Sequence, residues 1–298
     1  ITELVTPGVS LNENVLNHKE NNFLAAVHID RKTAGVAFLD ISTGEFLASE
    51  GTMEYIDQML NNFQPKEVLY EKRKGDQFQE AFGTKFYTFK LDDWIFTPEA
   101  ANDRLLKQFE TSSLKGFGIH NLTFGIIAAG AVLYYLDITQ HAQLGHITGI
   151  SRIEENRYVW LDKFTIRNLE LFHSPYEGAS TLIDVVDRTI SPMGGRLLKR
   201  WVSLPLKDIQ PINDRLDIVG HFASDPSFMK QVADLVRQIG DLERLISKVA
   251  VGRINPREVV QLKRALRAID PLRELCIKSH HWQLSEISLI PAGRLLTG

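Results

Sequence analysis

The chain has 298 residues, of which 44% are hydrophobic and 24% charged, and its formal net charge is −3. This composition is that of a globular protein and excludes the disordered and collagen-like classes. Because one hydrophobic core rarely serves so long a chain, the sequence predicts two domains.

The single cysteine, Cys276, excludes an internal disulfide and a zinc site built from paired thiolates. It favours a reducing, cytoplasmic location and a buried, unreactive thiol. The longest apolar run, residues 122–136, is shorter than the roughly 17–25 residues that cross a bilayer, so it predicts a buried helix. Residues 1–8 lack the pattern of a signal peptide, and the start at Ile1 predicts that the chain begins inside a longer protein.

Charge divides the sequence into two halves. Residues 1–150 contain 12 Lys and Arg against 19 Asp and Glu, whereas residues 151–298 contain 22 against 18. The asymmetry indicates a domain boundary near the middle of the chain. The small positive excess of the second half is too weak to indicate a nucleic-acid-binding surface.

The first half predicts a mixed α/β layer. Apolar, partly alternating runs indicate strands, and Thr52 and Thr97 are suited to cap two of the helices. The expected strands are residues 24–30, 34–42, 45–49, 67–71 and 85–89, and the expected helices are 52–63, 97–109 and 122–136.

The second half contains almost only helical signals. Apolar residues recur at spacings of three and four from Thr181 onward, in segments that include residues 191–202, 228–239, 242–249 and 259–275. Asn255 is a candidate N-cap and Pro256 suits the first helical position after it, so residues 242–275 predict an αα-hairpin.

Motifs for catalysis or cofactor binding are absent from the sequence. It contains no phosphate-binding glycine loop, no G-x-S-x-G nucleophile and no zinc-ligand spacing, so no catalytic, cofactor-binding or metal-binding residue is assigned. One alternative stays open. Asp40 closes a predicted strand, and with Glu71 and Asp92 or Asp93 it would form a magnesium-dependent nuclease site. The commoner role for such an aspartate is to cap a turn.

Basic residues follow one another in the predicted helix 191–202. Arg196, Lys199 and Arg200 are suited to contact phosphate, but beside an apolar stripe they are more commonly solvated or salt-bridged. We expect Trp201 to be buried and Arg196 to lie at a helix end or in an ion pair.

Several ordered blocks resemble the bacterial MutS family of DNA mismatch repair. In the first half these are Val-Thr-Pro-Gly at residues 5–8, Asp-Ile-Ser-Thr-Gly-Glu-Phe at 40–46 and Gly-Phe-Gly-Ile at 116–119. In the second half they are residues 167–171, 181–189, 192–201, 204–206, 241–245 and 252–258. The resemblance covers nearly the whole chain up to about Leu275.

The resemblance implies a ribonuclease H-like connector domain over residues 1–140 and the first part of a helical core, or lever, domain over residues 141–298. It further implies a non-catalytic module that transmits signals between DNA-binding and ATPase domains lying outside this chain. Residues 99–109 are the candidate surface for a MutL-like repair factor. Mismatched duplex DNA, a homodimer partner, ATP and Mg²⁺ belong to the intact protein. The competing hypothesis is the nuclease on the α/β half, and we expect the basic half alone to bind little duplex DNA.

Overall fold

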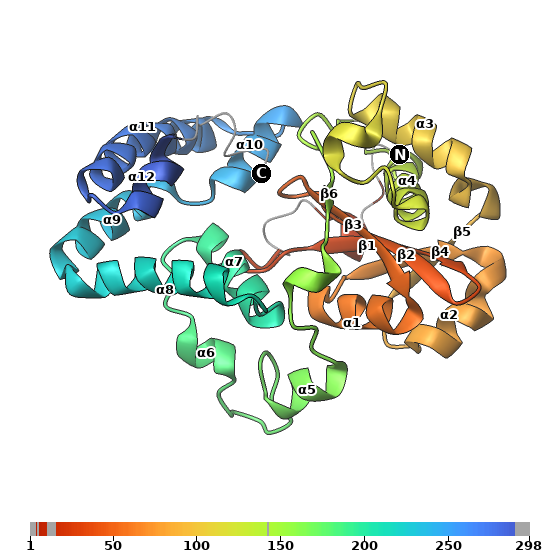
Figure 1. Cartoon of the computed structure of the whole chain (residues 1–298). Helices are drawn as coiled ribbons and strands as arrows, with labels where there is room; N and C mark the ends of the chain where they lie inside the picture. The colour runs from red at the N-terminus through yellow and green to blue at the C-terminus, as the bar shows by residue number, and fades with distance from the viewer. Residues whose placement is uncertain (1–3, 5, 11–15, 142, 290–298) are drawn as a thin grey trace. The chain divides into compact units, whose positions relative to one another are not determined.

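The computed structural model describes residues 4, 6–10, 16–141 and 143–289 and contains two compact units (Figure 1). The first unit comprises the residues up to Glu155 together with Trp160–Leu169, and the second comprises Asn156–Val159 and the residues from Glu170 onward. The first unit therefore continues past the predicted boundary at residue 140. The reason is that residues 151–153 join the edge of its sheet, where the Ile153 amide donates to the Ala48 carbonyl at 2.9 Å.

A six-stranded mixed sheet forms the centre of the first unit. Its strands lie in the order β5-β4-β1-β2-β3-β6. Strands β1, β2 and β3 form an antiparallel meander, β4 and β5 extend it in parallel from β1, and β6 pairs in parallel with β3. Their bounds are β1 Phe23–Asp30, β2 Thr33–Asp40, β3 Glu45–Thr52, β4 Glu67–Glu71, β5 Thr88–Leu91 and β6 Ser151–Arg152. The mixed α/β fold predicted for this half is confirmed.

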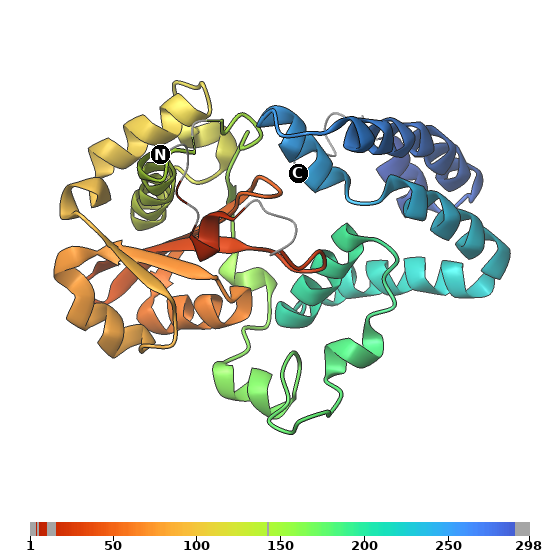
Figure 2. The ribbon, with the colours of Figure 1, turned by 180° about the vertical axis from the view of Figure 1, so that it is seen from behind.

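Helices cover both faces of the sheet (Figures 1 and 2). Because successive strand residues point to opposite faces, Ala25 and Val27 of β1 pack in one cluster with α1 (Met53–Phe63) and α2 (Gly75–Phe82). Leu24 and Ala26 pack on the other side with α3 (Pro98–Gln108) and α4 (Thr123–Ile138). A short helix, α5 (Lys163–Asn168), lies against α1.

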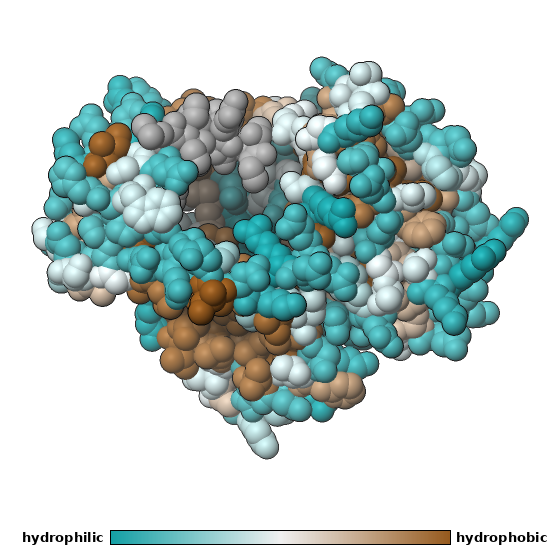
Figure 3. Space-filling view, in the orientation of Figure 1, coloured by the Kyte–Doolittle hydropathy of each residue, from teal (hydrophilic) through white to brown (hydrophobic). Residues whose placement is uncertain are grey.

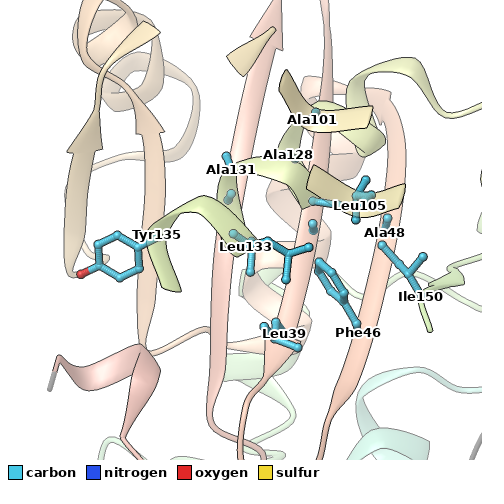
Figure 4. Packing of buried hydrophobic residues seen from close by; sticks show 14 of the residues in the cluster. Leu39, Phe46, Ala48, Ala101, Leu105, Ala128, Ala131, Leu133, Tyr135 and Ile150 are labelled. Carbon is cyan, nitrogen blue, oxygen red and sulfur yellow. The ribbon is translucent and has the colours of Figure 1, made fainter. Parts of the chain in front are cut away.

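Helix α4 is the buried helix predicted from the apolar run. Figure 4 shows its side chains Ala131 and Leu133 above the strands, beside Leu105 of α3. The backbones of β2 and α4 lie close together at Gly35. A Cβ added to Gly35 would lie 2.0 Å from the Phe124 carbonyl carbon, so the close approach requires glycine there. Across the part of the chain that the structure describes, no helix has both the length and the apolar character needed to traverse a bilayer.

Local sequence signals set most helix starts in this unit. The Thr52 side chain accepts a hydrogen bond from the Tyr55 amide, and the Thr97 side chain accepts one from the Ala100 amide with Pro98 at the first helical position. The sequence missed α2, which begins at Gly75 without a side-chain cap. It also placed β5 three residues too early.

The second unit is helical from α6 onward, as predicted. Its helices are α6 Leu182–Val186, α7 Pro192–Ser203, α8 Ile209–Ser224, α9 Pro226–Ile239, α10 Leu242–Ala250, α11 Pro256–Lys278 and α12 Trp282–Leu289. Helices α8 and α12 were not predicted. In α8, Pro211 stands within the first turn, where its missing amide hydrogen costs no helical hydrogen bond.

The predicted helical hairpin is formed by α10 and α11. The Asn255 side chain accepts from the Glu258 amide, and the Glu258 carboxylate accepts from the Asn255 amide at 2.8 Å, which completes a capping box. Glu258 also pairs with Lys248 of α10 at 2.5 Å. The turn between the two helices is therefore held by both backbone and side-chain contacts.

We expect Gly35→Ala to destabilise the first unit by about 3 kcal/mol, because its methyl group would overlap the α4 backbone. Gly116→Ala is the matched control, since a Cβ there would meet nothing within 4 Å. Urea unfolding of the full chain, followed by circular dichroism, measures both. Equal unfolding midpoints for the two variants would contradict the close approach of α4 to the sheet.

Candidate functional site

Asp40, the centre of the nuclease alternative, is fully buried and organises a turn. Its Oδ1 accepts hydrogen bonds from the Ser42 amide at 2.9 Å and the Ser42 hydroxyl at 2.6 Å. Its Oδ2 accepts from the Asn22 amide at 3.1 Å and the Asn21 side chain at 2.9 Å. The carboxylate thus holds the β2–β3 turn and the residues before β1 in place.

The His146 side chain contacts the backbone of the same turn. Its Nε2 lies 2.7 Å from the Ile41 carbonyl oxygen. Burial lowers the pKa of His146, against the opposing effects of the Ile41 carbonyl and the Asp40 charge. The ring is therefore a packing and hydrogen-bonding element of the turn.

The carboxylates that were expected to converge on a metal ion lie at opposite ends of the sheet. Asp40 pairs with Phe23 at the start of β1, whereas Tyr70, the residue before Glu71, pairs with Val27. Five residues at about 3.4 Å each separate the two ends by roughly 17 Å, whereas Mg²⁺ needs ligands at about 2.1 Å. Among the described residues, no three His, Cys, Asp or Glu side chains are grouped to hold a metal. The predicted cluster of Asp40 with Glu71 is therefore wrong.

Glu71 belongs instead to a buried charged cluster. Its carboxylate lies 3.1 Å from His28 Nδ1 and 2.7 Å from Lys74 Nζ, and Lys74 also donates to the Ile29 carbonyl. The Phe96 ring stacks on His28. Because the half-buried Lys74 pairs with the buried Glu71 carboxylate, the cluster joins the ends of β1 and β4 to the start of α2.

A second buried carboxylate, Glu67, fastens the N-terminal residues to the core. It accepts hydrogen bonds from the Tyr135 hydroxyl at 2.7 Å, the Gly8 amide at 3.0 Å and the Thr6 hydroxyl at 2.5 Å. Burial raises the pKa of Tyr135, so this phenol stays a hydrogen-bond donor. Sequence reasoning missed the cluster because its members lie about 60 or more positions apart.

The predicted docking helix is α3, and one face of it is open. Ala101 and Leu105 are buried against α4, and the Arg104 guanidinium forms two hydrogen bonds to Asp137 of α4, at 2.7 and 2.9 Å. The exposed residues of α3 include Glu99, Asn102, Asp103 and Lys107. The helix thus presents a polar, partly acidic surface on a fixed base.

The second unit contains a buried ion-pair network. Arg196 of α7 is only 4% exposed and forms two hydrogen bonds to Asp241, at 2.9 and 2.7 Å, and one to Glu243 at 2.6 Å. Burial alone lowers the pKa of Arg196, but the hydrogen bonds and charges of Asp241 and Glu243 outweigh it and the pKa is raised. The ion pair predicted for Arg196 is confirmed, and it ties α7 to the start of α10.

The prediction that Trp201 is buried is wrong. It is 39% exposed, and the Arg215 guanidinium lies 3.6 Å from its ring centroid. The aromatic face is covered by a stacked cation in place of an apolar core. Lys199 lies close enough to Asp184 to help lower the pKa of that carboxyl, after the larger effect of hydrogen bonds from Thr181. Nearby acidic side chains thus account for Arg196 and Lys199.

Exposed apolar side chains gather on α6, where Leu182, Val185 and Val186 are all exposed. Figure 3 shows an apolar area on this part of the surface. Such an area is typical of a protein-interaction surface.

We expect Arg196→Ala to destabilise the second unit by about 3 kcal/mol, because it removes the buried guanidinium that pairs with Asp241 and Glu243 and leaves Asp241 with the longer contact to the Arg244 side chain, at 4.0 Å. Arg237→Ala, which breaks an exposed pair with Asp234, is the control and should cost less than about 1 kcal/mol. Thermal and urea unfolding of the full chain measure both. If Arg196→Ala behaved like the control, the network would carry no structural role.

Comparison with known proteins covers both units. Residues 22–148 match the family described as MutS domain II, and residues 164–295 match MutS domain III. The chain is 60% identical over 287 residues to the DNA mismatch repair protein MutS of Bacteroides fragilis and to that of Bacteroides thetaiotaomicron. It is 55% identical over 279 residues to the same protein of Flavobacterium psychrophilum. These alignments cover 94–96% of the chain and 32–33% of each relative, so the chain spans about a third of their length. The chain belongs to the MutS family of DNA mismatch repair proteins and carries its domains II and III.

Proposed function

We propose that this chain is a non-catalytic module of a mismatch-repair ATPase. In this proposal it transmits signals between DNA-binding and ATPase domains, and its first unit docks a MutL-like repair factor. Mismatched duplex DNA, a homodimer partner, ATP and Mg²⁺ are bound by the intact protein, in the cytoplasm. The observation that carries the proposal is family membership in both units, combined with an open helix, α3, fixed on a buried one.

In this proposal the second unit moves as a stiff body. Close-packed interiors and paired buried charges resist deformation, so a displacement at one end of such a helix reaches the other end. The Arg196 network joins α7 to the start of α10, and the Lys248–Glu258 pair joins α10 to α11. These features support transmission, which further requires two discrete arrangements that DNA and nucleotide bias differently.

The first unit supports docking more directly. Helix α3 gains its position from Ala101, Leu105 and the Arg104–Asp137 pair, which leaves Glu99, Asn102 and Asp103 open to a partner. A surface on a rigid element costs less entropy to bind than one on a loop. The nuclease alternative has lost its main support, since Asp40 and Glu71 cannot share a metal ion.

The test is binding of the full-length protein to the MutL-like factor of the same organism, with mismatched duplex and ATP present. We expect Asn102→Arg with Asp103→Arg to weaken the complex tenfold or more, roughly 1.4 kcal/mol. The two substitutions put large positive side chains on the α3 surface in place of a small polar one and an acidic one. Gln77→Arg with Glu80→Arg, which makes the same exchange on exposed positions of α2, should bind normally.

Mismatch binding and ATP hydrolysis should be unchanged in both double variants. If the α3 variant bound the factor as tightly as the α2 variant does, α3 would not be the docking surface.

A further inference from the structure

Three large aromatic side chains are exposed within eight residues of the segment that precedes α3 in sequence. Tyr87 is 59% exposed, Phe89 is 41% exposed and Trp94 is 53% exposed. Phe89 belongs to β5, the end strand of the sheet, and Trp94 lies in the short helical turn that leads into α3. Burial of such residues is favourable, so their exposure together indicates a surface that a partner covers.

Two of these aromatics, Phe89 and Trp94, contact the buried helix α4. The Trp94 ring packs edge-on against Tyr134, with centroids 4.8 Å apart, and the Phe89 ring lies 5.2 Å from that of Tyr135. Ile138, one turn further along α4, is also exposed. We call Phe89, Trp94, Tyr134 and Ile138 the aromatic platform.

The platform adjoins the open face of α3. The Thr97 hydroxyl, which caps α3, donates a hydrogen bond to the Trp94 carbonyl at 3.1 Å. Trp94 is therefore fixed at the N-terminal end of the helix whose exposed residues form the proposed docking surface. The apolar platform therefore begins at the N-terminal end of α3.

Acidic side chains border this surface. Asp92, Glu99 and Asp103 are exposed, whereas nearby Asp93 and Asp137 are already paired with Arg73 and Arg104. Unpaired carboxylates repel phosphate, which disfavours a nucleic acid as the occupant. They attract a protein surface with Lys or Arg at its rim.

We propose that the aromatic platform is the apolar centre of the docking surface and that Trp94 is its anchor. The occupant is a protein surface with apolar side chains at its centre and basic side chains around them. This inference rests on the proposed function, in which that occupant is the MutL-like factor. Tryptophan in such a place is the residue type most enriched among those that dominate binding energy.

The decisive variant is Trp94→Ala in the full-length protein, with binding to the MutL-like factor measured by surface plasmon resonance. We expect at least tenfold weaker binding through faster dissociation, with partial recovery in Trp94→Phe. Phe164→Ala is the matched control, because Phe164 is similarly exposed on α5, which packs against α1 on the other side of the sheet. Its affinity should equal that of the unaltered protein.

A second variant tests the acidic border. Asp92→Lys should slow association and weaken its dependence on salt, whereas Asp76→Lys on α2 should leave both unchanged. Thermal melting of each variant shows that the fold is retained, as expected for exposed positions.

The outcomes separate the two proposals. Normal binding by Trp94→Ala, together with weak binding by the α3 double variant, would overturn the aromatic platform and leave docking on α3 intact. Unaltered protein that fails to bind the factor at all would overturn the proposed function itself. Weakened binding by Trp94→Ala, with a normal Phe164→Ala control, supports both.

Discussion

The close packing of α4 between the sheet and α3 is the constraint on which the first unit depends. Only glycine fits at positions 35 and 130, because neighbouring backbone atoms occupy the space of a side chain. A Cβ on Gly130 would lie 2.4 Å from Ala101 Cα. This contact fixes α3, and the Arg104–Asp137 pair locks its rotation. Since α4 also supports Trp94 through Tyr134, one buried helix positions both parts of the proposed docking surface.

Buried charged groups do structural work in both units. Asp40 holds a turn, Glu67 holds the N-terminal residues and Glu71 neutralises Lys74 beside His28. In the second unit Asp241 pairs with Arg196. A carboxylate whose oxygens already accept several hydrogen bonds has little capacity left for a metal ion. The buried carboxylates of the first unit therefore stabilise its fold, and the exposed helix surfaces stay available to partners.

The sequence predicts those features that local chemistry determines. Strands β1 to β4, helices α1, α3 and α4 and the capped hairpin at Asn255 follow from periodicity and caps. Helix α2 escaped prediction because it begins at Gly75 without a cap. Glu67 and Tyr135 meet across 68 residues, and the stacking of Arg215 on Trp201 depends on a second helix. Neither contact leaves a signal in the local pattern, and the same is true of the aromatic platform.

Because α4 packs between the sheet and α3, we expect it to be the most stable element of the first unit and the rigid base of the proposed docking surface. Native-state hydrogen exchange measures this directly, through the amides of Ile127, Val132 and Leu133. We expect their opening free energies to equal the free energy of unfolding of the unit, obtained from urea titration, because α4 cannot leave without exposing the core. Exchange of these amides through a local opening that costs several kcal/mol less than unfolding would show that α4 is not the most stable element of the unit.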